Sequence, residues 1–270
     1  MTKVALSGAS GNMGRMLRVE LQKRGVDLRS AGGRRPLELL HEGEDVMHGD
    51  LRDPGVVDKL LNGVGVLIHL AGTSVERPLP EIIENNLVAL HQVYEGARRN
   101  GVRRIVFASS NHAFGMYSVK DKLKLDAPFR PDGFYGLSKV WGEAMARMYW
   151  DKHGIEGISV RIGTAMGKPP ENFRQLSTWF GTDDLVDLIM RCIEAPDVGY
   201  AAVWGVSDNT RSYWDNTGAE RLGYRPRQNA EDYAAGILSQ PNPLDPIAQQ
   251  YQGGQFVTID FTPMERRRKT

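Results

Sequence analysis

The chain has 270 residues, enough for one large domain with a sizeable core and too few for an independent second domain of similar size. Its 34 basic and 33 acidic residues are interspersed and give a formal net charge of +1, so we expect neither nucleic acid nor an anionic membrane as a partner. The basic run at 265–269 is interpreted as a solvated end of the chain rather than a nucleic-acid tail.

Cysteine usage and the absence of long apolar runs bear on location. Cys192 is the single cysteine, so no internal disulfide can form, and its apolar surroundings predict a buried structural thiol. The sequence shows no secretory leader and no run of about 18 apolar residues. We therefore expect a soluble, cytoplasmic protein.

Strand-type and helical patterns alternate along the chain, which predicts an α/β fold with a Rossmann-type, doubly wound parallel sheet. Apolar runs typical of strands occupy 4–7, 26–32, 64–72, 103–110, 156–163 and 201–207. Helical patterns occupy 13–25, 86–101, 138–154 and 182–196, and Gly25, Gly101 and Gly154 follow three of them as expected left-handed caps.

After residue 165 the alternation weakens. Thr182 is the expected N-cap of the last long helix, with acids in its first turn and Pro196 beyond its end. From Asn209 onward the chain is polar and rich in Gly and Pro. We expect residues 1–165 to bind a dinucleotide and carry the catalytic groups. Residues 166–270 should add the remaining core strand and helix and a small substrate-binding lobe, all within one compact unit.

A glycine-rich turn links the first strand to the first helix. Gly8, Gly11 and Gly14 have the spacing G-x-x-G-x-x-G, which lets backbone N–H groups approach a pyrophosphate at the helix N-terminus. The plain alternative is a structural turn, but the position at the first strand favours dinucleotide binding. The candidate contacts in this turn are Gly8, Ser10, Gly11, Asn12, Met13 and Gly14.

Tyr135 and Lys139 are four residues apart on one predicted helical face, after a strand that ends in Ser109 and Ser110. A tyrosine hydroxyl has a pKa of about 10, so it needs a neighbouring positive charge to act as a base near neutrality. Lys139 can supply that charge. A bare Tyr-x-x-x-Lys pair is often a surface pair, and its place after a glycine-rich turn is what favours catalysis.

Together these motifs resemble the extended branch of the short-chain dehydrogenase/reductase superfamily. The resemblance implies that Ser110, Tyr135 and Lys139 are catalytic, that Ser109 is structural, and that Tyr135 and Lys139 also contact the cofactor. It further implies cofactor contacts from Asp50, Leu51, Leu70, Ala71, Gly72 and Asn86, the last opening a helix.

More specific segments, at 108–112, 130–139, 160–163, 173–180 and 251–254, resemble the uronate dehydrogenase family over nearly the full chain. That resemblance implies oxidation of C1 of a hexuronic acid, glucuronate or galacturonate, to an aldarolactone. Arg174 would bind the C6 carboxylate bidentately, while Arg161 would support the fold. The implied substrate contacts are Ser74, Ser110, Asn111, His112, Tyr135, Thr164 and Arg174.

Three alternatives remain open. Lys168 near Arg174 suggests another C6-anionic sugar, such as sulfoquinovose. The fold and catalytic residues also suit a nucleotide-sugar epimerase, although the lobe is small for one, or a non-enzymatic dinucleotide sensor.

The six histidines and one cysteine show no metal-ligand spacing. A homo-oligomer is expected from the superfamily.

The stretch AGGRRP at 31–36 ends the second strand, where dinucleotide-binding chains commonly present an acid to the adenosine ribose. Gly32 occupies that position here, and Arg34 and Arg35 follow. Because these arginines could pair with a 2′-phosphate, NADP is the expected preference, with NAD also accepted. The alternative is a pair of solvated loop arginines.

Overall fold

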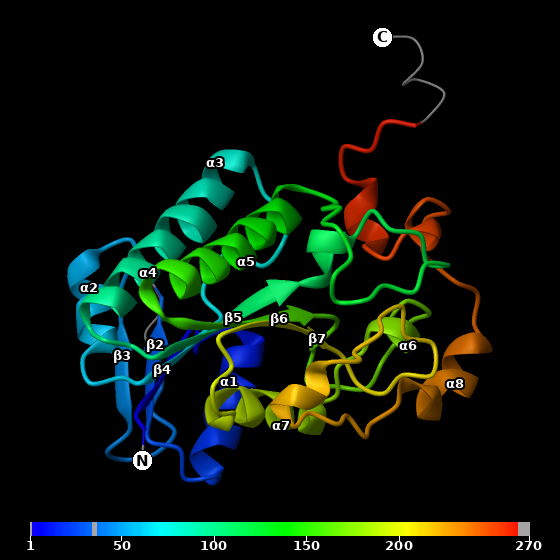
Figure 1. The fold of residues 1–270 in the computed structure, drawn as a ribbon. Coiled ribbons are helices and arrows are strands. Elements are labelled where there is room, and N and C mark those ends of the chain that lie inside the picture. Colours follow the sequence, from blue (N-terminus) through cyan, green and yellow to red (C-terminus); the bar gives the residue numbers. More distant parts are fainter. Residues whose placement is uncertain (1, 34–36, 264–270) are drawn as a thin grey trace.

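The computed structural model describes residues 2–33 and 37–263. Within them, a sheet of parallel strands has the order β3-β2-β1-β4-β5-β6-β7 (Figure 1). The strands are β1 Val4–Ser7, β2 Leu28–Gly32, β3 Asp45–His48, β4 Val66–His69, β5 Arg104–Ser110, β6 Glu156–Ile162 and β7 Tyr200–Gly205. The α-helices are α1 Asn12–Lys23, α2 Pro54–Leu61, α3 Leu79–Ile82, α4 Ala89–Arg99, α5 Phe134–His153, α6 Gln175–Thr178, α7 Thr182–Glu194 and α8 Ala234–Leu238. A π-helical segment, η1 Ile83–Val88, joins α3 to α4, and the 3₁₀ segments are η2 Asn111–Phe114, η3 Ala219–Leu222, η4 Ala230–Tyr233, η5 Ala248–Gln250 and η6 Gly254–Thr258.

Helices cover both faces of the sheet, as expected for a doubly wound fold (Figure 1). Successive strand residues point to opposite faces, so Val66 and Ile68 of β4 pack into one core and Leu67 into the other. The first core includes α1 and α7, and the second includes α2, α4 and α5. Burial on both faces explains why these strands read as continuous apolar runs.

The strand order reverses between β1 and β4, since the chain goes from β1 to β2 and β3 and then returns to β4. At such a reversal the connections leave in opposite directions, and a crevice opens at the carboxyl ends of the strands. The glycine-rich turn after β1 and the residues after β4 lie at this crevice.

Several local predictions can be compared with the backbone. Gly25, Gly101 and Gly154 have φ angles of 73°, 68° and 67°, which confirms their left-handed conformation. The N-cap expected at Thr182 was wrong: Gly181 is the N-cap of α7 and Thr182 is already helical. The predicted helix start at Asn86 was also wrong, because the helical run begins at Leu79, after Pro78, and Asn86 lies inside η1.

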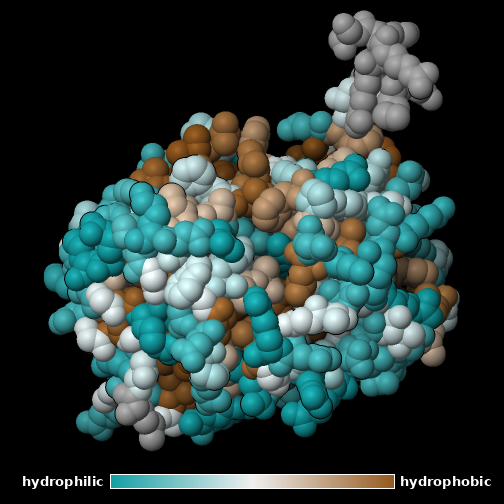
Figure 2. All heavy atoms as spheres, in the orientation of Figure 1, coloured by the Kyte–Doolittle hydropathy of each residue, from teal (hydrophilic) through white to brown (hydrophobic). Residues whose placement is uncertain are grey.

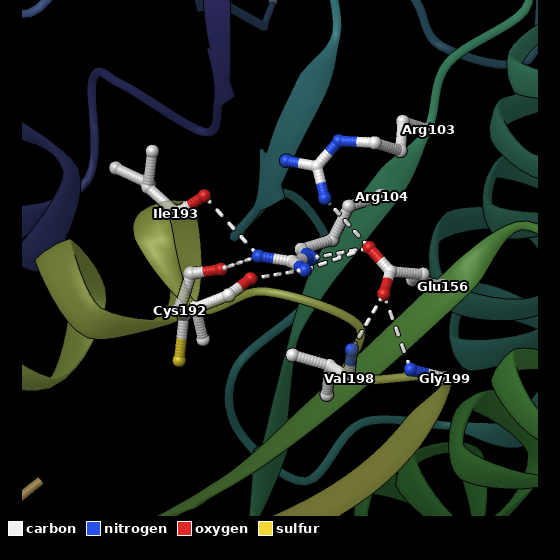
Figure 3. Close-up of polar contacts among 8 residues, drawn as sticks. Arg103, Arg104, Glu156, Cys192, Ile193, Val198 and Gly199 are labelled. Carbon is white, nitrogen blue, oxygen red and sulfur yellow. Dashed lines mark hydrogen bonds and ion pairs between the residues drawn. The ribbon is translucent and has the colours of Figure 1, made fainter. Parts of the chain in front are cut away.

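A buried ion pair joins β5, β6 and α7 at the amino-terminal edge of the sheet (Figure 3). Arg104 Nη2 lies 2.7 Å from Glu156 Oε2, and Arg104 is fully buried. The remaining donors of the guanidinium bind the carbonyls of Cys192, Ile193 and Ala195 at the end of α7. Glu156 Oε1 accepts from the backbone of Val198 and Gly199. The Cys192 thiol is buried, as predicted, and burial raises its pKa to about 12.

The lobe after β7 packs against the carboxyl end of the sheet through a cluster that includes Phe114, Trp204 and Trp214. Trp204 and Trp214 stack with ring centroids 4.8 Å apart, and a second small cluster holds α6 against η4. None of the helices in the described part of the chain is both long and apolar enough to cross a bilayer.

Candidate functional site

The crevice at the strand reversal holds a cavity of about 350 Å³. Gly8 has a φ of 75°, and a Cβ there would lie 2.7 Å from the Ala71 nitrogen, so only glycine lets the turn approach β4 this closely. Of the expected cofactor contacts, those that line the cavity are Gly8, Ser10, Gly32, Asp50, Leu51, Ala71 and Gly72. Asn12, Met13 and Gly14 form the first turn of α1 after its N-cap Gly11, and none of these four residues lines the cavity.

Two expected cofactor residues act differently. Leu70 packs against the hydrophobic core instead of lining the cavity. Asn86 fixes the loop after β4: its Oδ1 accepts from the Thr73 nitrogen at 2.7 Å, and its Nδ2 donates to the Thr73 carbonyl and to Ser138 Oγ. Asn86 therefore ties the crevice to helix α5.

Charges at the cavity rim are already paired. Arg52 lines the cavity and binds Asp50 at 2.5 Å and Glu84 at 3.1 Å. Arg34 and Arg35, which carried the expectation of a 2′-phosphate, lie outside the described residues. Among the residues the structure does describe, the lining thus offers no unpaired cation for a phosphate on the ribose.

Ser110, Tyr135 and Lys139 come together where β5 ends and α5 begins. Tyr135 is hydrogen-bonded to Ser110, and Lys139 Nζ lies 5.4 Å from the centre of the Tyr135 ring. Lys139 Nζ also donates to the Ala108 carbonyl at 2.9 Å. Asn86, which holds the loop after β4, donates to Ser138 Oγ on α5, between Tyr135 and Lys139 in sequence. The crevice and the three side chains are therefore joined in one site.

Burial moves the two pKa values in opposite directions. Burial is the main cause that raises the pKa of Tyr135 to about 12, against a smaller lowering by the Ser110 hydrogen bond. Burial also lowers the pKa of Lys139 to about 8. In the protein alone, both groups are therefore driven toward their neutral forms.

The expected substrate contacts mostly cluster beyond Ser110. Asn111 and His112 begin η2 directly after β5, and both are buried. With the Asn111 amide oriented so that both of its polar atoms find partners, its oxygen accepts from Arg174 Nη2 at 2.8 Å and its nitrogen donates to the Ile162 carbonyl at 3.0 Å. Thr164 follows β6 and bonds Thr178 Oγ1 at 2.9 Å, while Ser74 is exposed in the loop after β4.

Arg174 is the cation of this cluster. Its Nε donates to the Gln252 carbonyl at 2.8 Å, and burial lowers its pKa. No carboxylate of the described residues forms an ion pair with it. A second cavity of about 210 Å³ borders Arg174 and is lined also by Tyr213, Gln249 and Tyr251. A half-buried guanidinium without a carboxylate partner suits an anionic ligand.

Two other cations lie in different surroundings. Arg161 is buried, binds Glu143 at 2.9 Å and stacks 4.3 Å above the Phe114 ring, as expected of a residue that supports the fold. Ser109 joins the same network through Glu143. Lys168, which suggested a second cation near Arg174, is half exposed and pairs with Glu171 at 2.7 Å.

Four residues at the site were not predicted. Asp132 binds His112 Nδ1 at 2.6 Å, and Phe256 stacks on the His112 ring with centroids 3.9 Å apart. Gln252 supplies the carbonyl that holds Arg174. Glu76 accepts from the backbone nitrogens of Phe134 and Tyr135, both at 2.9 Å, and so caps α5. Asp132 lay within the quoted segment 130–139, so asking what its carboxylate binds could have found it. Gln252 likewise lay within the segment 251–254, whereas Glu76 and Phe256 have no local signal.

In the part of the chain that the structure describes, no three His, Cys, Asp or Glu side chains lie together in a way that could hold a metal ion.

Comparisons with known proteins agree with this geometry. Residues 4–180 match the model of the NAD dependent epimerase/dehydratase family. The chain is 42% identical over 256 residues to uronate dehydrogenase of Pseudomonas syringae pv. tomato, covering 94% of this chain and 93% of that protein.

Two solved structures are similar over nearly their whole length. A mutant uronate dehydrogenase of Agrobacterium tumefaciens complexed with NAD has a TM-score of 0.91 and 40% identity, covering 98% of this chain and 100% of that one. A glucuronic acid dehydrogenase of Chromohalobacter salexigens has a TM-score of 0.90 and 37% identity, covering 96% and 97%.

These findings correct the expected cofactor preference. The relative from Agrobacterium tumefaciens is complexed with NAD, and the matching family is NAD dependent, so the prediction that NADP is preferred was wrong. The described residues agree with this correction in one respect: the Arg52 guanidinium that lines the cavity is paired with the carboxylates of Asp50 and Glu84.

Proposed function

Since the chain belongs to the uronate dehydrogenases of the NAD dependent epimerase/dehydratase family, we propose that it oxidises the anomeric C1 hydroxyl of glucuronate or galacturonate to an aldarolactone, with NAD as cofactor. The observation that carries the substrate assignment is Arg174, a half-buried guanidinium that the Gln252 carbonyl and the Asn111 amide hold and that has no carboxylate partner among the described residues.

The crevice residues fit a dinucleotide. The glycine-rich turn brings backbone N–H groups and the start of α1 to the cavity, where a pyrophosphate would be stabilised. Gly32, Asp50 and Leu51 line the adenosine end, while Ala71 and Gly72 lie at the end of β4. NAD, when bound, supplies the hydride acceptor.

Tyr135 is the proposed general base. As a phenolate, its oxygen takes the proton of the C1 hydroxyl and becomes a hydroxyl again, while Ser110 donates a hydrogen bond to the C1 oxygen. The burial that holds the pKa of Tyr135 near 12 must be offset by positive charge before the phenolate can form. Lys139, on the same helical face, provides that charge when protonated.

At the other end of the sugar, Arg174 binds the C6 carboxylate through its planar donors. Ser74, Asn111, His112 and Thr164 are the proposed contacts of the ring hydroxyls. The anion is thereby fixed at one end of the substrate and the C1 hydroxyl at the other, beside Tyr135.

Steady-state assays test this proposal. Glucuronate and galacturonate should each reduce NAD at a rate that saturates with substrate. Arg174→Gln should lower kcat/KM by about 10²-fold or more, because a charge-assisted, bidentate pair with the substrate is lost, with the KM for NAD little changed. Lys168→Gln is the control, since its ammonium is occupied by Glu171. If neither sugar acid reduces NAD, the substrate assignment is wrong.

The alternatives have little support. The sulfosugar hypothesis depended on a second cation at the anion site, and Lys168 is paired at the surface instead. The non-enzymatic sensor was wrong, since the chain belongs to a family of dehydrogenases. Isomerisation of a nucleotide sugar without net NAD reduction would favour the epimerase.

We also propose a homo-oligomer. Apolar side chains gather over α3 and α5, along the top of the molecule in Figure 2. We call this surface the α3–α5 face; its members are exposed by 37–50%, and they are Leu79, Ile83, Phe134, Leu137, Trp141 and Met148. A continuous apolar surface of this kind is typical of a subunit contact.

Two further predictions concern organisation and location. We propose that residues 1–165 bind NAD and carry the catalytic groups, while residues 166–270 complete the core and hold most of the substrate. A cytoplasmic location stays a prediction from the sequence.

A further inference from the structure

A carboxylate is buried behind the substrate contacts. Asp132 has a fully buried side chain, and its Oδ2 lies 2.6 Å from His112 Nδ1. The backbones of the two residues are also joined, since the Asp132 nitrogen donates to the His112 carbonyl at 3.2 Å. Asp132 Oδ1 has no hydrogen-bond partner in the described chain.

Glycines make the space for this carboxylate. A Cβ at Gly115 or at Gly253 would collide with Asp132 Oδ2, and a Cβ at Gly136 would lie 3.1 Å from Oδ1. These glycines come from three separate segments, the end of η2, helix α5 and the residues before η6. His112 is the sole ion-pair partner of Asp132 within the described residues. A buried carboxylate so enclosed is costly to the fold, and its one polar contact is the imidazole.

Two aromatic side chains also contact the His112 ring. Phe256 stacks on it at 3.9 Å, and the edge contact with Tyr135 has ring centroids 5.7 Å apart. The backbone nitrogen of His112 donates to Ser110 Oγ at 3.1 Å. The ring is thus fixed in position directly beside two catalytic side chains.

The carboxylate also determines the position of the ring proton. An ionised carboxylate only accepts hydrogen bonds, so Nδ1 must carry the proton. In the neutral imidazole, Nε2 then presents a lone pair, and no described residue donates to it. That atom can accept a hydrogen bond from a hydroxyl and cannot donate one.

We propose that Asp132 is a positioning residue, which holds His112 in the Nδ1–H tautomer so that Nε2 accepts a hydrogen bond from a ring hydroxyl of the substrate. This inference rests on the proposed function, because it takes the substrate to be a hydroxylated sugar acid. It assigns a role to Asp132 and a hydrogen-bond direction to His112.

Nitrogen NMR tests the tautomer without any substrate. In ¹⁵N-histidine-labelled protein saturated with NAD, the signals that disappear in His112→Gln belong to His112. They should show a protonated Nδ1 and an unprotonated Nε2. Protonation at Nε2, alone or with Nδ1, would overturn the proposal.

Kinetics test the consequence. Asp132→Asn keeps the shape but can donate to Nδ1, which permits the opposite tautomer. We expect the KM for glucuronate to rise about tenfold, because the loss of one hydrogen bond to the substrate corresponds to about that factor. The KM for NAD should stay within about twofold of the wild-type value. Asp126→Asn is the control, because Asp126 is an exposed acid in the same segment between β5 and α5, and both KM values of this variant should match those of the wild type.

The double variant separates positioning from packing. Asp132→Asn combined with His112→Gln should be no worse than His112→Gln alone, because Asp132 acts through His112. Additive losses, or an unchanged KM in Asp132→Asn, contradict the inference. If Asp132→Asn does not fold, the NMR result on the wild type decides. Wild-type protein that oxidises neither uronate refutes the proposed function, while the tautomer measurement still stands.

Discussion

Tyr135 and Lys139 show how a buried site changes the chemistry expected of its residues. Their spacing suggests a lysine that activates a tyrosine, yet burial raises the pKa of Tyr135 and lowers that of Lys139. In the protein alone, the phenolate that serves as the base is therefore scarcely populated near neutral pH. Its activation requires additional positive charge, which couples proton removal to a filled cofactor site.

Tyr135→Phe tests the role of the hydroxyl. The substitution removes the proposed base and leaves the ring contacts with His112 and Phe256 in place. We expect kcat to fall by about 10³-fold or more, with NAD affinity within about threefold of wild type. Turnover and fluorescence titration with NAD measure the two effects. Retained turnover would show that another group takes the proton.

Lys139→Met tests the cost of the buried amine. The pKa of Lys139 is lowered from 10.5 to about 8, and each unit corresponds to about 1.4 kcal/mol, so the charged amine destabilises the fold by up to about 3 kcal/mol near neutrality. We expect the variant to be inactive but more stable by about 1–3 kcal/mol at pH 7, after the lost bond to the Ala108 carbonyl is counted.

The pH dependence has a defined sign. Between about pH 8 and 10.5 the unfolded chain holds a proton on Lys139 that the folded protein has released, so wild-type stability rises relative to the variant with pH. The difference in urea unfolding free energy between the two proteins should shrink across this window. A constant difference would show that burial does not depress the Lys139 pKa.

Residues with a sequence signature were easier to find than their partners. Tyr135, Lys139 and the glycine-rich turn follow recognisable spacings, and Arg174 followed from the family segment. Asp132, Gln252 and Phe256 depend on contacts between distant segments, such as the 78 residues between Arg174 and Gln252. No periodicity in one sequence reports such contacts.

At the scale of elements, β5 has a different task at each end. Its first residue, Arg104, joins the ion pair with Glu156 and binds the end of α7 (Figure 3). Its last residue, Ser110, contacts Tyr135. The strand thus carries stability at the amino-terminal edge of the sheet and chemistry at the carboxyl edge.

Arg104→Met should destabilise the protein by about 3–5 kcal/mol, because a buried ion pair is broken and the α7 carbonyls lose their donors. Arg103→Gln is a matched control. Arg103 binds the same Glu156 oxygen at 2.7 Å but is 48% exposed, so its loss should cost at most about 1 kcal/mol. Urea unfolding measures both. Equal losses would mean that the exposed pair stabilises as much as the buried one.

Most of the strands and long helices were predicted correctly, because buried parallel strands are continuously apolar and amphipathic helices repeat every 3.6 residues. Element ends were less certain. Gly181 caps α7 without a side chain, and Pro78 and Pro80 start the helical run before Asn86. Short helices of the lobe lack a repeat long enough to recognise.

At the scale of the whole molecule, the α3–α5 face is exposed and includes one side of α5, the helix that also carries the catalytic Tyr135. Trp141 and Leu137 are among its most exposed members, and the stripe at 134, 137, 141 and 148 follows one side of α5. A second copy that covers this face would also restrain the helix that carries Tyr135.

Trp141→Glu tests the subunit contact. A charge in an apolar interface is costly, so the variant should elute as a smaller species than wild type in size-exclusion chromatography with light scattering, with its circular dichroism preserved. Leu238→Glu is the control, since Leu238 is 41% exposed on α8, away from this face. A wild-type monomer at micromolar concentration would rule out the oligomer.

The position of Phe256 in the chain has a consequence for the protein during its own synthesis. The strands that line the NAD crevice all precede residue 140, and so does Tyr135. The ring that stacks on His112 and the carbonyl that holds Arg174 belong to Phe256 and Gln252, near the end of the chain. Chains leave the ribosome N-terminus first, and α7, which covers one face of the crevice strands, also precedes residues 252–256. A nascent chain can therefore complete both faces of its dinucleotide site while the segment that packs on His112 and holds Arg174 is still missing.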